Sequence, residues 1–458
     1  MTVPALKISR ILIANRGEIA LRIIRTCKRL GIETVIVYSQ ADKDAIYLKL
    51  ADRAICIGPP PARDSYLKIN NIIAAAEIAD VDAIHPGYGF LSENAHFAEV
   101  CRACKIAFIG PPTSAIEMLG DKIKAKQLAR LAKVPTVPGS EGALSDVEAA
   151  VKLATQIGFP VMLKAASGGG GRGMRVSHND VSLRANFTQA AREAEAAFGD
   201  GTLYMEKFIE SARHIEVQIL GDEHGTILSL GERDCTIQRR NQKLIEESPS
   251  PVLDKRQRYD IQIAAVRLME AAKYTNAGTV EFIYDVKARK FYFMEVNTRL
   301  QVEHPVTEMV TGLDLVEQQL RVASGEKLAF RQKDIDARIK TGGHAIECRI
   351  NAEDPKRSFA PCPGRIGIFS PPAGSSIRMD THIYSGYNIP PYYDSMLGKL
   401  VVHGVDRIDA VKRMKLALDQ LVLEGVPTTI SVLREVMGHV KFVAAAYDTS
   451  FLTSEMGL

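Results

Sequence analysis

The sequence predicts a multidomain protein in which an α/β region with a parallel sheet is followed by α+β regions with antiparallel strands. The chain has 458 residues, too many for one ordinary hydrophobic core. Strand-like and helix-like segments alternate over residues 8–115, which is typical of a parallel sheet with helices on both faces. Beyond residue 200, several strand-like segments follow one another with short connections, which favours antiparallel pairs.

The composition is that of a globular protein. Hydrophobic residues make up 46% and charged residues 24% of the chain, and the net charge of +4 is small for this length. We therefore expect neither nucleic acid nor a membrane among its partners. No apolar run reaches membrane-spanning length and the N-terminus lacks the apolar core of a signal peptide, so we expect a cytoplasmic protein. The seven scattered cysteines do not form a disulfide framework.

The N-terminal region is expected to begin with a buried strand over residues 10–14, a tight turn and an amphipathic helix over residues 18–30. The alternation continues with elements expected at residues 34–38, 83–84, 94–105 and 106–109. The first turn lacks G-x-G-x-x-G, so a dinucleotide site is not indicated.

Two polar segments follow strands of this region. Arg16 comes after the first strand, and the loop at residues 85–94, which includes Tyr88, follows the strand at residues 83–84. Open α/β sheets bind ligands at the carboxyl ends of their strands. We therefore predict that both segments contribute to a ligand site, although the turn residues at 85–94 are also compatible with an ordinary loop.

Residues 110–112 indicate a boundary after a first domain at residues 1–115, and residues 116–335 are expected to form a second, α+β domain. It begins with a helix and loop, after which Ser145 is expected to cap a helix that ends near residue 157. Further elements are expected at residues 160–164, 180–198, 202–208, 213–220, 225–230, 255–273 and 278–284. A third lobe, residues 336–458, contains a helix near residues 407–421.

A glycine-rich loop at residues 167–173 follows the strand that ends at Lys164. Its consecutive glycines, which include Gly170 and Gly171, expose backbone N–H groups that can bind phosphates, and Lys164 adds a positive charge. A flexible linker is the weaker alternative, because linkers are Ser/Gly-rich over a longer span. The loop is neither a Walker A loop nor a protein-kinase loop, because the accompanying motifs are missing.

A pair of carboxylates is expected across one hairpin. Glu281 lies in the middle of a strand whose hairpin partner carries Glu295. Carboxylates that face each other across an antiparallel pair repel unless a cation lies between them. We therefore predict a divalent metal that bridges nucleotide phosphates here, with two independently solvated carboxylates as the alternative.

The segment at residues 291–305 begins as a strand with three aromatic residues and then becomes polar. The polar residues that alternate with apolar ones are Glu295, Asn297, Arg299, Gln301 and Glu303. In an extended chain these side chains would lie on one face. Glu295 and Asn297 offer hard oxygen ligands for Mg²⁺, Arg299 a fork for an oxyanion, and Glu303 a base. A solvated strand face is the alternative.

The segment at residues 233–247 is dense in charge. Such segments are usually solvated surfaces. The cations of this one could instead bind an anion beside the phosphates.

Four segments together resemble biotin carboxylase, a family of the ATP-grasp superfamily; they lie at residues 164–175, 233–247, 295–305 and 344–355. The resemblance covers about residues 8–450 and is strongest to the free-standing subunit of bacterial-type acetyl-CoA carboxylase. It implies a Rossmann-like N-terminal domain, an ATP-grasp domain with a mobile lid at about residues 135–205, and a C-terminal mixed α/β lobe.

The resemblance also implies a ligase reaction. ATP phosphorylates bicarbonate to carboxyphosphate, which decomposes to CO₂ and phosphate. The phosphate deprotonates the ureido nitrogen of biotin, which is then carboxylated. Within acetyl-CoA carboxylase this half-reaction leads to malonyl-CoA and fatty acids. The alternative is a subunit of a pyruvate or propionyl-CoA carboxylase.

Residue roles follow from the resemblance position by position. The residues that would hold ATP are Lys122, Lys164, Gly170, Gly171, Glu206, Lys207, Phe208, Ile209, His214 and Asn241. Those that would bind Mg²⁺ or Mn²⁺ are Glu281, Glu295 and Asn297. Those that would bind bicarbonate or biotin are Lys243, Arg299, Gln301, Val302, Arg349, Arg16 and Tyr88. Lys243 and Arg299 would also be catalytic, Glu303 would deprotonate bicarbonate, and Arg349 would stabilise the biotin enolate.

The chain departs from the family pattern at a few positions. Asn241 stands where the family usually has a His beside the nucleotide, and Asn cannot carry charge near pH 7. Tyr47 replaces a common His, and Ala360 and Cys362 stand where Leu and Ser are usual. We expect these three to be packing variants.

The chain carries no Ala/Val-Met-Lys-Met site for biotinylation. We therefore expect biotin to arrive on a separate biotin carboxyl carrier protein. The resemblance adds carboxyltransferase subunits as partners and a homodimer as the assembly. Two other functions stay open at this stage: an ATP-grasp ligase that joins a carboxylate to an amine, and a non-catalytic ATP-binding subunit.

Overall fold

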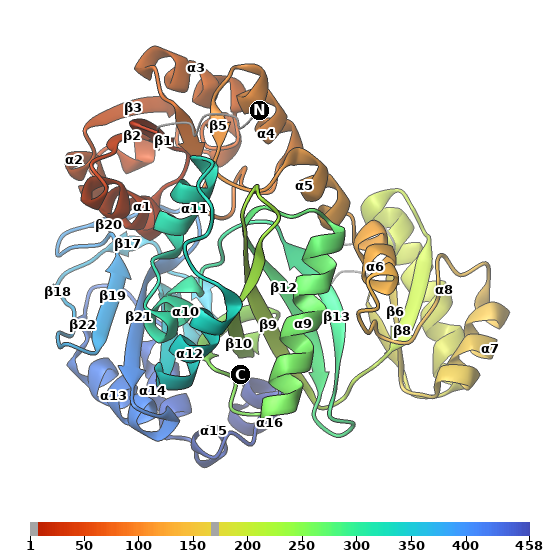
Figure 1. Ribbon diagram of the computed structural model, residues 1–458. Helices are drawn as coiled ribbons and strands as arrows, with labels where there is room; N and C mark the ends of the chain where they lie inside the picture. The colour runs from red at the N-terminus through yellow and green to blue at the C-terminus, as the bar shows by residue number, and fades with distance from the viewer. Residues whose placement is uncertain (1–7, 166–173) are drawn as a thin grey trace.

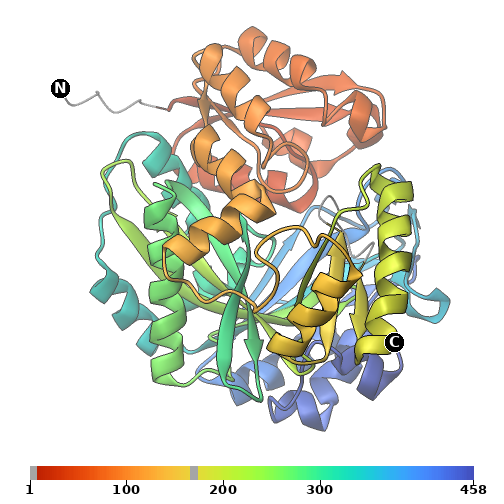
Figure 2. The same cartoon turned by 90° about the vertical axis from the view of Figure 1, so that its right-hand side faces the viewer.

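The computed structural model describes residues 8–165 and 174–458. Figures 1 and 2 show the N-terminal domain at the top, a large sheet in the centre, and a small α/β unit beside the sheet. Within the described residues, none of the helices has both the length and the apolar character that crossing a membrane requires.

The N-terminal domain is a parallel five-stranded sheet in the order β3-β2-β1-β4-β5. Its strands are β1 (Arg10–Ile13), β2 (Glu33–Ser39), β3 (Arg53–Gly58), β4 (Ala83–His85) and β5 (Ala107–Phe108). Its helices are α1 (Gly17–Arg29), α2 (Ile46–Leu50), α3 (Ile69–Ala79) and α4 (Ala95–Ala103). The predicted parallel sheet is confirmed. The strand order reverses between β1 and β4, so the loops that follow these two strands meet at one crevice.

A central antiparallel sheet carries most of the site. Its eight strands run in the order β13-β12-β9-β10-β11-β14-β21-β19. They are β9 (Ala212–Gly221), β10 (Ile227–Arg239), β11 (Gln242–Ser248), β12 (Asn276–Asp285), β13 (Lys290–Asn297), β14 (His344–Asn351), β19 (Ile377–Thr381) and β21 (Met396–Gly404). The pairing of β11 with β14 joins strands from the expected second and third regions in one sheet.

Helices cover both faces of this sheet. On one face Ala345 and Val401 pack against Val306 and Val310 of α10 (His304–Thr311). On the other face, strand residues such as Ile346 pack against the C-terminal helices. The remaining helices around the sheet are α5 (Thr113–Gly120), α6 (Lys122–Leu131), α9 (Lys255–Ala271), α11 (Leu315–Ala323), α12 (Gln332–Thr341), α13 (Arg407–Gln420), α14 (Ile430–Gly438), α15 (Val440–Val443) and α16 (Phe451–Met456).

A small unit lies beside the sheet, at the right of Figure 1. It consists of β6 (Val161–Ala165), β7 (Arg175–Ser177) and β8 (Leu203–Lys207), with α7 (Val147–Ile157) and α8 (Asp180–Phe198). We call this unit the lid, residues 147–165 and 174–207. Its core is small, with buried residues such as Leu163, Leu183 and Met205.

Short strands complete the C-terminal lobe: β15 (Glu353–Asp354), β16 (Ala360–Pro361), β17 (Gly364–Arg365), β18 (Phe369–Ser370), β20 (Asn388–Ile389) and β22 (Val422–Leu423).

Most expected elements are confirmed with ends within a few residues, and three details are corrected. Asp146, and not Ser145, caps α7, because its carboxylate accepts the N–H of Ala149 at 2.8 Å. The strand expected at residues 225–230 continues to Arg239. Strand β13 ends at Asn297, so the extended alternation expected to residue 303 is wrong beyond that point.

Candidate active site

One cavity of about 1190 Å³ lies between the N-terminal domain, the lid and the central sheet. Every described residue to which a site role was assigned lines it: Arg16, Tyr88, Lys122, Lys164, Glu206, Lys207, Phe208, Ile209, His214, Asn241, Lys243, Glu281, Glu295, Asn297, Arg299, Gln301, Val302, Glu303 and Arg349. Gly170 and Gly171 lie outside the described residues.

Lys243 is the centre of the cavity floor. It is the second residue of β11, next to the hairpin turn. Its Nζ donates to Glu216 at 2.6 Å, Glu281 at 2.9 Å and Glu303 at 2.6 Å. Burial opposes the charge, but the three carboxylates together raise the pKa of Lys243 well above its ordinary value. Lys243 is therefore a fixed positive charge.

Glu303 lies between two cations. It is fully buried at the start of α10, and its second oxygen accepts from Arg349 at 2.9 Å. Burial alone would raise its pKa, yet Lys243 and Arg349 hold the pKa of Glu303 well below the ordinary value. Arg349 also donates to Glu246 at 2.6 Å. Glu303 is thus an ionised carboxylate, able to accept a proton.

The polar side chains that were expected on one face of a long strand are brought together by the end of β13 and the loop that follows it. After β13 ends, Arg299 and Gln301 lie in a loop, and Gln301 donates to Glu281 on β12 at 3.2 Å. Arg299 donates to Gln301 at 3.0 Å, to Asn297 at 3.2 Å and to Glu93 at 2.9 Å. Glu93 also accepts the N–H of residue 298 at 3.0 Å. Glu93, from the loop after β4, therefore anchors this segment.

Glu281 and Glu295 are direct partners across the β12–β13 pair, so their predicted opposition is confirmed. Burial and the charge of Glu281 raise the pKa of Glu295. Lys122 Nζ lies 3.8 Å from Glu295, too far for a hydrogen bond. Asn297 borders the pair and donates to Glu281 at 2.8 Å. Two carboxylates and an amide oxygen are the hard donors that Mg²⁺ prefers, so the residues fit the predicted ion.

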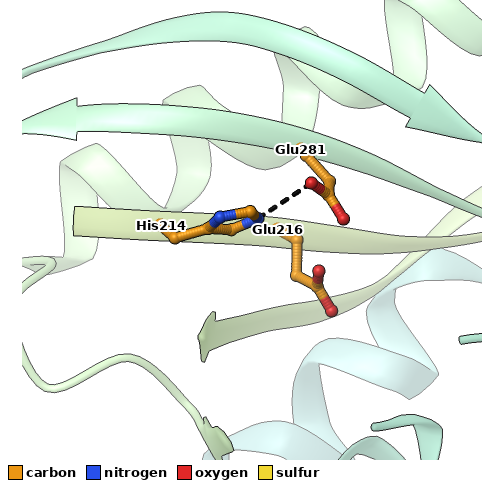
Figure 3. Close-up of side chains that lie close together, drawn as sticks. All are labelled: His214, Glu216 and Glu281. Atoms are coloured by element: carbon orange, nitrogen blue, oxygen red, sulfur yellow. Dashed lines mark ion pairs between the residues drawn. The ribbon is translucent and has the colours of Figure 1, made fainter. Parts of the chain in front are cut away.

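A second group of possible ligands lies beside this pair. Figure 3 shows His214 and Glu216 on β9 and Glu281 on β12. His214 Nε2 lies 2.9 Å from a Glu281 oxygen. Both oxygens of Glu216 already face cations, Arg233 at 2.5 Å and Lys243 at 2.6 Å. Glu216 is fully buried and, unlike Glu281, does not line the cavity, so it is a poor candidate for a metal ligand.

The lid side of the cavity carries its own cluster. Glu206 on β8 accepts from Lys164 at 2.6 Å and from Lys126 on α6 at 2.5 Å. Burial opposes ionisation, but these two lysines keep the pKa of Glu206 below its ordinary value. Lys207 donates to the carbonyl of Phe159 at 2.7 Å. Lys164 is the second-last residue of β6, and Ala165 separates it from the residues that the structure does not describe.

The N-terminal domain contributes two residues at its crevice. Arg16 donates to both oxygens of Asp42, at 2.8 and 2.7 Å, and stacks over the ring of Tyr393 at 4.1 Å. Tyr88 donates to Glu18. The two side chains therefore reach the cavity in fixed orientations.

Asn241 occupies the turn between β10 and β11. Arg240 and Asn241 both have positive φ, +48° and +66°, as in the tight hairpin turns that suit right-twisted strands. Asn tolerates this backbone better than most residues. The replacement of His by Asn at this position therefore fits the local fold.

Several site residues had not been assigned a role from the sequence: Glu93, Lys126, Glu216, Arg233 and Glu246. Glu216 could have been found, because it alternates with His214 on the predicted strand at residues 213–220. The contacts of Glu93 and Lys126 join elements distant in sequence, and no local pattern indicates them.

Three family descriptions match successive parts of the chain: "Biotin carboxylase, N-terminal domain" over residues 7–116, "Carbamoyl-phosphate synthase L chain, ATP binding domain" over residues 121–331, and "Biotin carboxylase C-terminal domain" over residues 347–454. Biotin carboxylase 1 of Bacillus subtilis is 52% identical over 445 residues, which cover 97% of this chain and 98% of the relative.

Two solved structures are similar over their whole length. A biotin carboxylase–β,γ-ATP complex from Campylobacter jejuni is 53% identical with a TM-score of 0.91, covering 98% of this chain and 99% of that chain. The biotin carboxylase domain dimer of Hydrogenobacter thermophilus 2-oxoglutarate carboxylase, solved with MgADP, ADP and bicarbonate, is 48% identical with a TM-score of 0.89, covering 97% of each chain.

Proposed function

The chain belongs to the biotin carboxylase family of ATP-grasp enzymes, and from this premise we propose how its own residues carry out the ATP-dependent carboxylation of biotin. The observation that carries the proposal is the buried chain of ion pairs from Arg349 through Glu303 to Lys243. It places an ionised carboxylate between two fixed cations, next to an opposed pair of carboxylates suited to Mg²⁺.

One group of residues would bind the metal ion and the phosphates of ATP. Glu281, Glu295 and Asn297 would hold Mg²⁺ (or Mn²⁺), which neutralises phosphate charge when bound. Lys122 and Lys164 would add positive charge at the phosphates. Lys164 now binds Glu206, so ATP phosphates would compete with that carboxylate.

Bicarbonate would bind beside Lys243, Arg299 and Gln301, at the backbone of Val302. Glu303 would take its remaining proton, so that an oxygen of the dianion can attack the γ-phosphorus of ATP. An anion that binds to Lys243 weakens the hold of that cation on Glu303. The pKa of Glu303 then rises toward the operating pH, which makes it a better base than it is in the ligand-free arrangement.

The second step would transfer the carboxyl group. Attack of bicarbonate releases ADP and gives carboxyphosphate, whose cleavage gives CO₂ and phosphate. The phosphate takes the proton of the biotin ureido nitrogen, and this nitrogen bonds to the carbon of CO₂. The ureido oxygen gains negative charge in that step, and Arg349, which stays charged at any working pH, would stabilise it. Arg16 and Tyr88 would border the biotin ring.

We further propose that biotin arrives on a separate carrier protein and leaves to a carboxyltransferase subunit, with acetyl-CoA as the final acceptor and pyruvate or propionyl-CoA as the alternative. A relative that is part of a 2-oxoglutarate carboxylase supports leaving the acceptor open.

A homodimer is proposed as the assembly, supported by the dimer in that relative. The proposed domain limits are residues 1–115, 116–335 and 336–458.

The test is ADP release from Mg²⁺-ATP and bicarbonate, with and without free biotin. We expect biotin to stimulate release in the wild-type protein, and Glu303→Gln to lose at least about 100-fold of this activity, because the base is removed. Glu99→Gln is the matched control, because Glu99 is exposed, and it should behave as wild type. ATP binding without biotin-stimulated release in the wild-type protein would contradict the proposed function.

A further inference from the structure

Two carboxyl groups face each other beneath Arg349 and have no part in the proposed steps. Glu246 on β11 and Glu347 on β14 are direct partners in the antiparallel register, and both are fully buried. Side chains at such positions lie on the same face of the sheet, about 5 Å apart at their Cβ atoms. Two negative charges there would repel strongly in a buried setting.

Glu347 has no counter-ion contact of its own. Neither of its oxygens has a hydrogen-bond partner among the described residues. Arg349, two residues along the strand, donates instead to Glu246 and Glu303.

Lys399 on β21, opposite Arg349 in register, is the other cation near Glu347. It is fully buried and is already bound, to Glu18 at 3.0 Å and to the carbonyl of Val302 at 2.9 Å.

Among the residues that the structure describes, the other titratable groups packed near Glu347 supply no further cation. Tyr88, from the loop after β4, donates to Glu18, and burial keeps its pKa well above the ordinary value, so it stays neutral. On α10, which packs on β14, burial keeps the pKa of His304 well below the ordinary value, and Glu308 is paired with Arg22. The other face of β14 carries a separate cluster at Glu247, His344 and Arg407.

A buried carboxylate without a partner is too costly to remain ionised, so it holds a proton. Burial, together with the charges of Glu246 and Glu303, raises the pKa of Glu347 well above the ordinary value against the influence of Lys399 and Arg349. Burial, together with the charge of Glu303, raises the pKa of Glu246 to about 7 against the influence of Arg349.

We propose that Glu347 holds a proton while Glu246 is ionised, so that the two carboxyl groups keep a single negative charge beneath Arg349 and this charge positions its guanidinium beside Glu303. Glu347 is then a positioning residue, which acts on the reaction through Glu246 and Arg349. The positioning role rests on the function proposed above, whereas the proton on Glu347 does not.

Infrared spectroscopy of the full-length protein tests the proton directly. At pH 8, above the pKa of about 7 to which Glu246 is raised, the wild-type spectrum should contain a carbonyl stretch of a buried, protonated carboxyl group, and Glu347→Gln should lose it. Glu247→Gln is the matched control, because Glu247 is the next residue on β11 but faces the other side and accepts from His344 at 2.7 Å and Arg407 at 2.6 Å. It should leave the band unchanged. A band that survives in Glu347→Gln would overturn the proposal.

Thermal unfolding of the same proteins gives a second, independent test. Because the pKa of Glu347 is raised in the folded state, its stabilising contribution is complete below the ordinary glutamate pKa of about 4.3 and is lost as the pH rises above it. Gln never ionises. Glu347→Gln should therefore match the wild-type Tm near pH 4.5 and exceed it increasingly toward pH 8. A Tm below that of the wild-type protein at pH 8 would show that the carboxylate is charged and paired.

The pH profile of biotin-stimulated ADP release tests the positioning role. Loss of the proton of Glu347 at alkaline pH puts a second negative charge beside Arg349, so wild-type kcat should fall there. Glu347→Gln should move that alkaline limb upward by about one pH unit or more. An unmoved limb would refute the positioning role. Absence of biotin-stimulated turnover in the wild-type protein would instead refute the proposed function and leave the infrared result standing.

Discussion

The two sides of the cavity are built in different ways. On the central sheet, Lys243, Glu303 and Arg349 are held by ion pairs of 2.6 to 2.9 Å, and none of the three side chains is more than 13% exposed. On the lid side, Lys164 is 24% exposed, and the lid has only a small core. The sheet side is therefore preorganised for charge, and we propose that the lid side rearranges when a nucleotide binds.

The largest effect is expected from removing the central cation. Lys243→Met would leave Glu216, Glu281 and Glu303 facing one another without their shared partner. Losing one member of a buried ion-pair cluster costs about 3–5 kcal/mol. We expect a clearly lower Tm and no measurable activity. Lys124→Met, at a lysine whose side chain is 63% exposed, is the control. An unchanged Tm in Lys243→Met would mean that this side is not held by the cluster.

Arg349→Lys tests whether the sheet side acts in chemistry and not in nucleotide binding. Lysine cannot reproduce the contacts of Arg349 with both Glu246 and Glu303. We expect kcat to fall by about 100-fold while the KM for ATP stays within about twofold of wild type. Steady-state kinetics measure both. A rise in the KM for ATP without a fall in kcat would place Arg349 on the nucleotide side.

Lys164→Met should produce the opposite pattern on the lid side. The contact with Glu206 is partly exposed, so the loss of stability should stay below about 1 kcal/mol. The KM for ATP should rise by about tenfold, because a charge at the phosphates is lost. Unfolding curves and ATP titrations give the two values. A large drop in Tm with unchanged ATP binding would reverse the proposed division between the two sides.

The smallest effect is expected at the hairpin turn. Asn241→Ala places a Cβ-bearing residue without a polar side chain at a φ of +66°, which costs about 1 kcal/mol. Asn241→Gly should cost less, because glycine accepts this backbone. Comparison of the two Tm values, measured without ATP, separates the effect on the turn conformation from any effect on ATP binding. Equal Tm values for both variants would argue against a conformational reason for Asn at this position.

The sequence predicts those features that depend on local patterns of polar and apolar residues. The alternation of residues 8–115 predicted the parallel sheet, and the hairpin predicted that Glu281 would oppose Glu295, which the register confirms. The alternation after residue 297 predicts a strand where the structure has a loop, because a loop and a strand share polar-apolar patterns over a few residues. Contacts such as Arg299–Glu93 depend on packing between distant segments and have no local pattern.

The boundary expected at residue 335 illustrates the same limit. The change from helices to a strand near His344 is visible in the sequence, but the pairing of β11 with β14 is not. That pairing brings Glu246 opposite Glu347 and Arg349 beside Glu303. The geometry of the sheet side of the cavity therefore arises from tertiary structure. The roles of the site residues and the domain limits stay predictions that the experiments above address.

The most direct measurement of the central claim follows oxygen from bicarbonate into phosphate. ATP cleavage through carboxyphosphate transfers one bicarbonate oxygen to the released phosphate. With ¹⁸O-labelled bicarbonate and free biotin, the wild-type protein should release phosphate that carries one ¹⁸O atom, and Glu303→Gln should release almost none. Unlabelled phosphate from the wild-type protein, at an unchanged rate of ATP cleavage, would show that water and not bicarbonate attacks ATP and would contradict the account.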